Sequence, residues 1–164
     1  MIIKHKIKDN FLEHDVFNRI KENILHYSFP WYFQKDVAFT NKREKNESFY
    51  FTHLFYINEI KSDFYELLQP LLKKIKIKKL LRIKANLYPN LNKKIINNKH
   101  IDYEFKHKGL IFYLNTNNGY TILKNNLKIK SIENRVLFFD PSIEHSSTHC
   151  TNQQIRLNIN INYH

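Results

Sequence analysis

The C-terminal segment 154–163, QIRLNININY, alternates strictly between apolar and polar residues. This period of two predicts a β-strand with two unlike faces. The apolar face carries Ile155, Leu157, Ile159 and Ile161, and the polar face carries Arg156, Asn158, Asn160 and Asn162. We expect the apolar face to pack on the core or under helices. An ordinary antiparallel strand would turn its polar face to water. The position of Arg156, shortly after His145, favours instead a polar face that lines a cavity.

The second half of the chain contains further short runs of strand-like composition separated by polar turns. They are LLRIKANLYP (80–89), GLIFYLN (109–115), YTIL (120–123), LKIKSI (127–132) and NRVLFFDP (134–141), and the aromatic run FYFTHLFYI (49–57) precedes them. With few glycines in the chain, asparagine is expected to supply many of the turns, since it tolerates the left-handed conformation.

Two segments of the first half have helical spacing. Residues 10–27 repeat apolar residues every three or four positions, with Asp9 or Asn10 as the expected N-cap. Residues 62–79 begin with Ser62 and are expected to be interrupted or kinked at Pro70. Helices followed by five to seven short strands predict a mainly β (α+β) protein, in which a sheet sandwich or open barrel has helices packed outside.

The length of 164 residues fits one domain, 1–164. Within it we expect residues 1–79 to supply helical support and N-terminal strands, and residues 80–164 to form the β core. A single cysteine, Cys150, fits a reducing compartment. The N-terminal residues lack the apolar stretch of a signal peptide, and no apolar run is long enough to span a bilayer. We therefore expect a cytoplasmic protein without a membrane partner.

The formal net charge of +12 raises the possibility of nucleic-acid binding. Only five of the 27 basic residues are arginine, the residue that best binds phosphates and guanine edges. The excess of lysine, asparagine and isoleucine resembles a broad compositional bias, so nucleic acid stays a possible but not a favoured partner. The polar loop 40–48, TNKREKNES, is either a solvated loop or a lid over a site.

Two histidines and an aspartate form a candidate metal site. His100 and Asp102 are two positions apart in an extended segment, and His145 follows the apolar run 136–139. A His-x-Asp pair is common by chance, so it is weak evidence alone. Two imidazoles and one carboxylate on one side of a ferrous ion would leave three positions open, of which a 2-oxo acid can take two. His149 is an alternative ligand, although the position of His145 at a strand end favours His145.

Charge balance then requires a further residue. A dicarboxylic 2-oxo acid bound to such a metal would bury its second carboxylate, and an unpaired buried charge costs roughly 3–5 kcal/mol. An arginine that binds both carboxylate oxygens is the natural partner. Arg156, on the polar face of the next predicted strand, is placed to provide it.

The ordered set of Tyr88-Pro89, His100-x-Asp102, Tyr113 in IFYLN, His145 in NRVLFFDPSIEH and then Arg156 resembles the iron(II)/2-oxoglutarate-dependent oxygenases. It is most similar to the prolyl 4-hydroxylase-like branch with its small stand-alone bacterial and phage-encoded members. The resemblance covers about half of the chain, residues 80–164.

This resemblance implies a double-stranded β-helix, or jelly roll, with N-terminal helices packed on one sheet. It implies Fe(II) bound by His100, Asp102 and His145, with 2-oxoglutarate and O2 as cosubstrates. Arg156 would bind the distal carboxylate of 2-oxoglutarate, and Tyr88 and Tyr113 would line its pocket. Asn158 stands where many relatives have a serine or threonine.

The implied reaction is hydroxylation of a C–H bond, coupled to decarboxylation of 2-oxoglutarate to succinate and CO2. The implied substrate is a peptidyl or free amino acid, with proline as one candidate. Asn162 occupies the position of a second arginine in nucleic-acid demethylases, which weakens but does not remove an oxygenase acting on nucleic acid. The alternative from another class is a non-catalytic basic jelly-roll module that binds nucleic acid.

Overall fold

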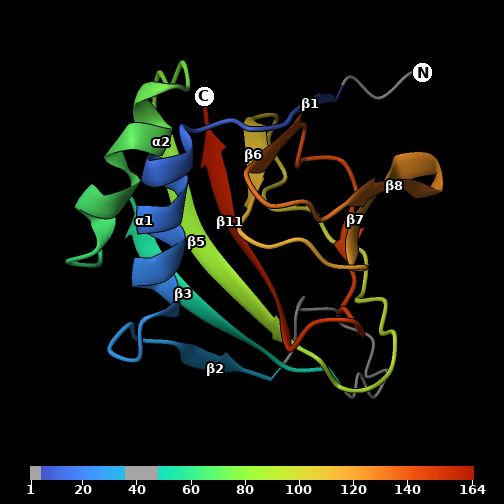
Figure 1. The fold of residues 1–164 in the computed structure, drawn as a ribbon. Helices are drawn as coiled ribbons and strands as arrows, with labels where there is room; N and C mark the ends of the chain where they lie inside the picture. Colours follow the sequence, from blue (N-terminus) through green and yellow to red (C-terminus); the bar gives the residue numbers. More distant parts are fainter. Residues whose placement is uncertain (1–4, 36–47) are drawn as a thin grey trace.

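The computed structural model describes residues 5–35 and 48–164, which form two antiparallel β-sheets with helices on the outside of one of them (Figure 1). In the described residues the large sheet has eight strands in the order β1-β9-β6-β11-β5-β3-β2, with β4 paired to β3. Its strands are β1 (Lys6–Lys8), β2 (Tyr32–Gln34), β3 (Tyr50–Ile57), β4 (Glu59–Ile60), β5 (Leu80–Pro89), β6 (Lys108–Tyr113), β9 (Arg135–Phe139) and β11 (Ile155–Tyr163).

The small sheet has the order β10-β7-β8, with strands β10 (Ser146–Ser147), β7 (Tyr120–Leu123) and β8 (Leu127–Lys130). The short 3-10 helix η2 (Lys124–Asn126) joins β7 to β8. Among the described residues, six asparagines have a positive φ: Asn10, Asn58, Asn92, Asn125, Asn126 and Asn134. The expectation that asparagine supplies left-handed turn residues is therefore confirmed, because its short polar side chain tolerates this conformation. The predicted mainly β jelly-roll architecture is also confirmed.

The two predicted helices are shorter than expected. The first, α1 (His14–Leu25), begins after Glu13, whose side chain makes no capping hydrogen bond, so the expected cap at Asp9 or Asn10 is wrong. Asn10 has a φ of 48°, which cannot continue into a helix. The backbone amide of Phe11 instead donates to the carbonyl of Asn134, 2.9 Å away, and so ties this segment to the turn before β9.

The second predicted helix, 62–79, is reduced to a 3-10 turn η1 (Tyr65–Leu68) and a five-residue helix α2 (Gln69–Lys73) with Pro70 in its first turn. Helical structure ends there because the chain turns back to pair with the C-terminus. The amide of Lys78 donates to the carbonyl of His164, and the amide of His164 donates to that of Lys79.

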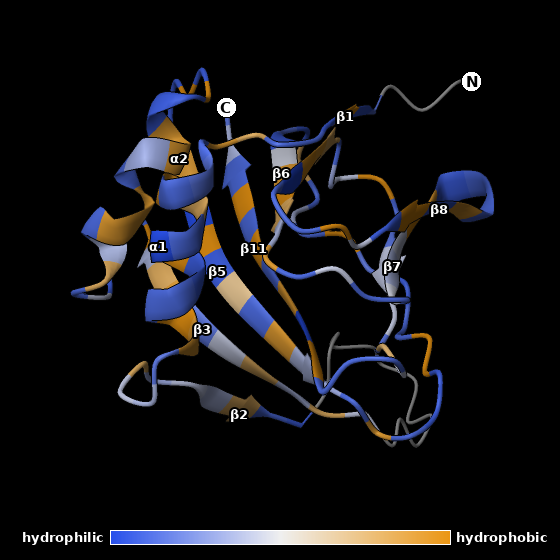
Figure 2. Ribbon diagram, viewed as in Figure 1, coloured by the Kyte–Doolittle hydropathy of each residue, from blue (hydrophilic) through white to orange (hydrophobic). Residues whose placement is uncertain are grey.

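The helices cover one face of the large sheet, as expected. Figure 2 shows apolar and polar residues alternating along β5 and β11. The apolar residues of β11, Leu157, Ile159 and Ile161, have no exposed surface and pack with Phe17, Ile20 and Ile24 of α1 in one core cluster. Burial of such side chains contributes roughly 1.5–3 kcal/mol each.

The other face of the large sheet turns toward the small sheet. Ile111, Tyr113, Leu137 and Phe139 of the large sheet form a second cluster with Leu123 and Ile129 of the small sheet. The polar face of β11 lies on this side and is also buried: Arg156 and Asn162 have no exposed surface, Asn158 is 3% exposed and Asn160 8% exposed. The polar residues therefore line the interior, and the view of an ordinary strand with its polar face in water is wrong.

Among residues 5–35 and 48–164, no helix has the length and apolar character needed to cross a bilayer. The predicted loop or lid at 40–48 lies outside the described residues except for Ser48, which is buried.

Candidate metal centre

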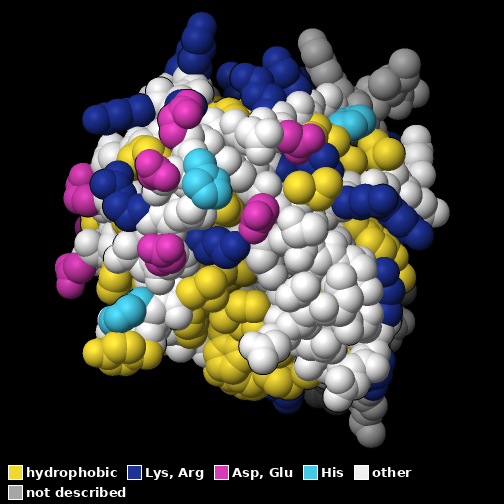
Figure 3. Space-filling view, in the orientation of Figure 1, with side chains coloured by type: hydrophobic (Ala, Val, Ile, Leu, Met, Phe, Trp, Pro, Cys, Tyr) yellow, Lys and Arg dark blue, Asp and Glu magenta, His cyan; other side chains and the backbone are white. Residues whose placement is uncertain are grey.

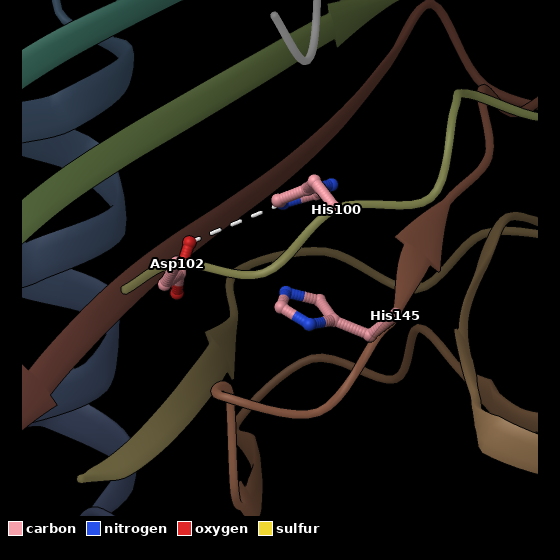
Figure 4. Close-up of side chains that lie close together, drawn as sticks. All are labelled: His100, Asp102 and His145. Atoms are coloured by element: carbon pink, nitrogen blue, oxygen red, sulfur yellow. Dashed lines mark ion pairs between the residues drawn. The ribbon is translucent and has the colours of Figure 1, made fainter. Parts of the chain in front are cut away.

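Backbone pairing brings the two candidate histidines together. His100 and His145 form an antiparallel bridge in which each amide donates to the other's carbonyl, at 2.9 and 3.0 Å. The segments around them are also joined by the amide of His149, which donates to the carbonyl of Ile95. The imidazole rings consequently lie side by side, with centroids 4.5 Å apart (Figure 4).

Asp102 completes the group from the other side. Its amide donates to the carbonyl of Pro141, which fixes the chain beyond His100. Its carboxylate accepts hydrogen bonds from the Arg82 guanidinium at 2.8 Å and from the Asn160 amide at 3.1 Å. Burial alone would raise the pKa of Asp102, but Arg82 and the two imidazoles outweigh it and lower the pKa to about 2. The carboxylate is therefore ionised at neutral pH.

Both imidazoles present a lone pair to the same space. The Nδ1 atoms of His100 and His145 lie 3.4 and 3.0 Å from the carbonyls of Asn98 and Ile143, which can only accept, so each Nδ1 carries the proton. This leaves Nε2 as the ligand atom of each ring, the usual arrangement for metal-bound histidine. Burial, and then the neighbouring His145, lower the pKa of His100 to about 4, so that it is neutral at pH 7.

The residues present fit a metal ion. One potential ligand atom from each of His100, Asp102 and His145 lies within 4.8 Å of the others. Two imidazoles and one carboxylate match the donor set of facial iron(II) sites. Hydrogen bonds from Arg82 and Asn160 hold the carboxylate in place, as outer partners of metal ligands commonly do.

Arg156 lies in the same pocket as the two histidines, deep between the sheets. Its Nε donates to Ser131 Oγ at 2.8 Å and its Nη2 donates to Thr121 Oγ1 at 3.1 Å. Its guanidinium carbon lies 5.2 Å from the ring centroid of Tyr88 and 5.8 Å from that of Tyr113. The remaining nitrogen, Nη1, is buried and has no hydrogen-bond partner among the described residues. A buried guanidinium without a carboxylate partner is a site for an anion.

The other residues predicted to bind a cosubstrate surround this guanidinium. The Tyr113 hydroxyl donates to Thr121 Oγ1 at 2.8 Å, beside the contact of Arg156 with the same atom. Tyr88 stacks on Tyr50, with ring centroids 5.4 Å apart. Asn158 lines the pocket but accepts a hydrogen bond from Asn86 Nδ2 at 3.0 Å, so its side-chain oxygen is already engaged. The pocket connects the metal group to Arg156 and is lined by Asn86, Tyr88, His100, Ile111, Thr121, His145, Ser146, Ser147, Arg156, Asn158 and Asn160.

His149, the alternative ligand, lies apart from the metal group. Its Nδ1 donates to the carbonyl of Pro89 at 2.7 Å, and its ring contacts the edge of Tyr88. It therefore borders the Arg156 side of the pocket. Of the described residues that could hold a metal, His149 is not in the group formed by His100, Asp102 and His145.

Two polar residues near the site, Arg82 and Lys84, were not identified from the sequence, whereas Asn160 was placed on the cavity-lining face of 154–163 without a role. Arg82 and Lys84 stand on β5 with the same alternation as Asn86 and Tyr88, so the period-two pattern of LLRIKANLYP contained the signal. The register then places them opposite the polar face of β11, since Arg82 pairs with Asn162, Lys84 with Asn160 and Tyr88 with Arg156.

Comparison with solved structures identifies the fold. The chain superposes on a prolyl-4-hydroxylase from Pseudomonas putida with a TM-score of 0.64 and 10% identity, covering 98% of this chain and 92% of that one. It superposes on a prolyl hydroxylase from Trichoplax adhaerens, in complex with a peptide of hypoxia inducible factor, with a TM-score of 0.68 and 16% identity over 97% and 82% of the two chains.

A third structure with this fold is SnoN, a non-heme alpha ketoglutarate dependent epimerase from nogalamycin biosynthesis, with a TM-score of 0.66 and 12% identity over 99% and 78% of the chains. No family model and no curated protein sequence matches the chain. The fold is thus that of the 2-oxoglutarate and iron(II) oxygenases, including prolyl 4-hydroxylase-like structures, as the sequence resemblance implied.

Proposed function

We propose that this protein is an iron(II)/2-oxoglutarate-dependent oxygenase. The observation that carries the proposal is one pocket with two unlike groups in its wall: His100 and His145, which converge with Asp102, line it at one end, and Arg156, whose Nη1 has no hydrogen-bond partner among the described residues, lines it at the other. A dicarboxylic 2-oxo acid matches both ends, since one end can chelate it through a metal and the other can neutralise its far carboxylate. The fold supports this assignment.

In this proposal, His100, Asp102 and His145 hold Fe(II), which together with 2-oxoglutarate supplies the activation of O2. Arg156 binds the distal carboxylate, and Thr121 and Ser131 hold its guanidinium so that Nη1 faces the pocket. The rings of Tyr88 and Tyr113 beside Arg156 exclude water, which strengthens the charge pairing. Arg82 and Asn160 keep the Asp102 carboxylate oriented and ionised.

The reaction that we propose is hydroxylation of a C–H bond, in which one oxygen atom of O2 enters the product and the other enters succinate as CO2 leaves. A carboxylate ligand, Asp102, occupies the third ligand position, which favours hydroxylation over halogenation. A peptidyl or free amino acid is the proposed class of substrate, since the similar structure from Trichoplax adhaerens holds a peptide.

The deciding experiment is anaerobic titration of the purified protein with Fe(II) and 2-oxoglutarate. We expect a weak visible charge-transfer absorption that needs both components, and succinate release once O2 is admitted. Asp102→Ala should abolish both signals, because two imidazoles alone hold Fe(II) weakly. Asp15→Ala, which removes an exposed aspartate from the first turn of α1, is the matched control and should leave both unchanged. A folded protein that shows no absorption band would contradict the proposal.

The alternative function, a basic module that binds nucleic acid without a metal, predicts different behaviour. Its affinity for DNA or RNA would fall steeply with salt and would be indifferent to iron chelators and to Asp102→Ala. Nucleic-acid binding with that profile, together with no succinate release, would favour the module.

A further inference from the structure

Lys84 is a positively charged residue between the sheets that has no role in the proposed reaction, unlike Arg82 and Arg156. It stands on the face of β5 that carries Arg82, Asn86 and Tyr88, and its partner across the strand pair is Asn160, which holds Asp102. Lys84 is thus next to the proposed iron site. Its ammonium group lies 5.6 Å from the ring centroid of Tyr50. Tyr50 in turn stacks on Tyr88 of the Arg156 pocket.

The other positively charged residues near Lys84 already have an opposite charge beside them, in the structure or in the proposed complex. Arg82 pairs with Asp102 at 2.8 Å, and Arg156 is matched by the distal carboxylate of 2-oxoglutarate in the proposed complex. Among residues 5–35 and 48–164, no carboxylate forms an ion pair with Lys84. Burial, with Arg82 acting in the same direction, lowers the pKa of Lys84 to about 8 although the nearby Asp102 opposes this, which leaves Lys84 mostly protonated at pH 7. Asp102 is itself paired directly with Arg82, and a partly buried ammonium group without an ion pair of its own is costly unless a ligand provides one.

Lys84 forms one wall of a cavity distinct from the Arg156 pocket. The cavity, of about 980 Å³ including space open to solvent, is lined by Tyr32, Gln34, Tyr50, Thr52, His53, Leu54, Lys61 and Lys84. His53 has a fixed orientation, because its Nδ1 donates to the carbonyl of Pro30 and its Nε2 accepts from Ser62 Oγ. The cavity therefore combines aromatic walls, hydroxyl groups and one inner cation, the composition of a site for a polar small molecule or residue.

We propose that this cavity receives the substrate and that Lys84 binds a carboxylate group of it. The inference rests on the proposed function and names its class of substrate: an amino acid or related compound with a free carboxylate. A monoanion fits best, because of the two lysines among the described residues that line the cavity, Lys61 pairs with Glu59 and Lys84 forms no ion pair with a described carboxylate. A phosphate dianion would call for a bidentate arginine, and of the described residues lining this cavity none is an arginine.

The test measures binding without metal or 2-oxoglutarate, so its outcome does not depend on turnover. Saturation-transfer NMR on the metal-free full chain would compare N-acetyl amino acids with the corresponding amides, which differ only in the carboxylate. We expect the acids to bind about 10-fold more tightly than the amides, the usual scale for a charge-assisted hydrogen bond. Lys84→Met should bring the ratio close to one, and Lys84→Arg should preserve it.

Two controls separate this role from others. Lys61→Met removes a lysine of the same cavity that already has a partner, and it should leave the preference for acids unchanged. The affinity of the Fe(II)-loaded protein for 2-oxoglutarate should be the same in Lys84→Met and in the unmodified chain. Circular dichroism and thermal unfolding establish that each variant is folded.

Four results would overturn the inference: equal binding of acids and amides, an unchanged preference in Lys84→Met, a preference lost equally in Lys61→Met, or weaker 2-oxoglutarate binding in Lys84→Met. Stronger competition by inorganic phosphate than by acetate would also overturn it, in favour of a phosphate site. If instead the Fe(II) and 2-oxoglutarate absorption is absent while the preference for acids persists, the proposed reaction fails and the carboxylate site stands.

Discussion

Arg156 is the largest fully buried side chain of the described residues, and its environment is organised around its charge. Two hydroxyl groups and two tyrosine rings surround the guanidinium, and none of these neighbours is an anion. Leaving a buried charge uncompensated is expensive, so a protein keeps this arrangement where a ligand completes it. A single residue thus supports the charge and position of the proposed cosubstrate.

Gly119 allows Arg156 to take this position. A Cβ atom at residue 119 would lie 2.6 Å from Cδ of Arg156 and 2.8 Å from Oδ1 of Asn117, which accepts the Gly119 amide. Gly119→Ala should therefore displace the guanidinium and raise the KM for 2-oxoglutarate by about 10-fold or more, the scale of one lost charge-assisted bond. Steady-state succinate formation measures the change.

A double-mutant cycle shows whether Gly119→Ala acts through Arg156. In an Arg156→Met background, the second substitution should cause little further loss, because the group that it displaces is already gone. Additive losses in the two variants would mean that Gly119 serves the turn before β7 and not the guanidinium.

At the scale of elements, β5 and β11 form the centre of the molecule because both of their faces are buried. Their apolar residues meet the helices, and their polar residues form a row across the pair, with Arg82 opposite Asn162, Lys84 opposite Asn160, and Tyr88 opposite Arg156. Antiparallel pairing puts directly opposed side chains on the same face. This register brings the charges of two strands into one layer next to the proposed metal ligands.

His53 of β3 links the large sheet to the helical side through two hydrogen bonds, to the Pro30 carbonyl and to Ser62. Burial lowers its pKa below the ordinary 6.5, although the bond to Pro30 opposes this. The unfolded chain therefore binds more protons than the folded one, and the free energy of unfolding should decrease as the pH falls below 6.5. Burial lowers the pKa of His149 as well, so His149 also makes the free energy of unfolding decrease as the pH falls.

The variant His53→Gln should weaken this pH dependence. At about pH 7.5 it should lower the free energy of unfolding by about 1–3 kcal/mol, because two buried hydrogen bonds are disturbed. Between about pH 7.5 and pH 5.5 it should lose less further stability than the unmodified chain, since one protonation site is gone. Urea unfolding at the two pH values tests this; equal losses in both proteins would exclude His53 as a contributor.

At the scale of the whole molecule, positively charged side chains lie both on the surface and between the sheets. On the face in Figure 3, lysine and arginine side chains are interspersed with acidic ones over the helices and do not form one continuous basic stripe. Between the sheets, β5 and β11 contribute three cations, Arg82, Lys84 and Arg156, and among the described residues Asp102 is the carboxylate that pairs with one of them, Arg82. This excess of positive charge is suited to small anions, and a nucleic-acid partner stays an untested alternative.

Metal and cosubstrate binding should stabilise the whole fold, because the ligands come from segments that only the folded chain brings together. Saturation at 100 times the Kd adds about 2.7 kcal/mol, which corresponds to a rise in Tm of roughly 5–10 °C for a chain of this size. Differential scanning calorimetry with Mn(II) and 2-oxoglutarate under nitrogen would measure it. The shift should disappear with EDTA and in Asp102→Ala, and should persist in Asp15→Ala. An unchanged Tm in the unmodified protein would contradict the site.

The sequence by itself determined the elements whose signal is local. Strand-like composition between polar turns placed 80–89 and 120–123 as strands with the bounds observed, and the strict alternation of 154–163 assigned each residue of β11 to its correct face. The sequence also identified His100, Asp102 and His145, which the fold brings together, and Arg156, which lines the same pocket as the two histidines, although their role in binding metal and cosubstrate stays a prediction.

Only the tertiary structure decided whether the polar face of a strand is exposed to solvent, where the helices end and which charged side chains pair. The helix expected from residue 10 begins later because Asn134, distant in sequence, takes the amide of Phe11. Likewise, the position of β5 between β3 and β11 decides that Arg82 forms an ion pair with Asp102, whereas Lys84 forms none with a carboxylate of the described residues. Alternation fixes the side of a strand on which a residue lies, whereas burial and ion pairing depend on neighbours that the chain supplies from elsewhere.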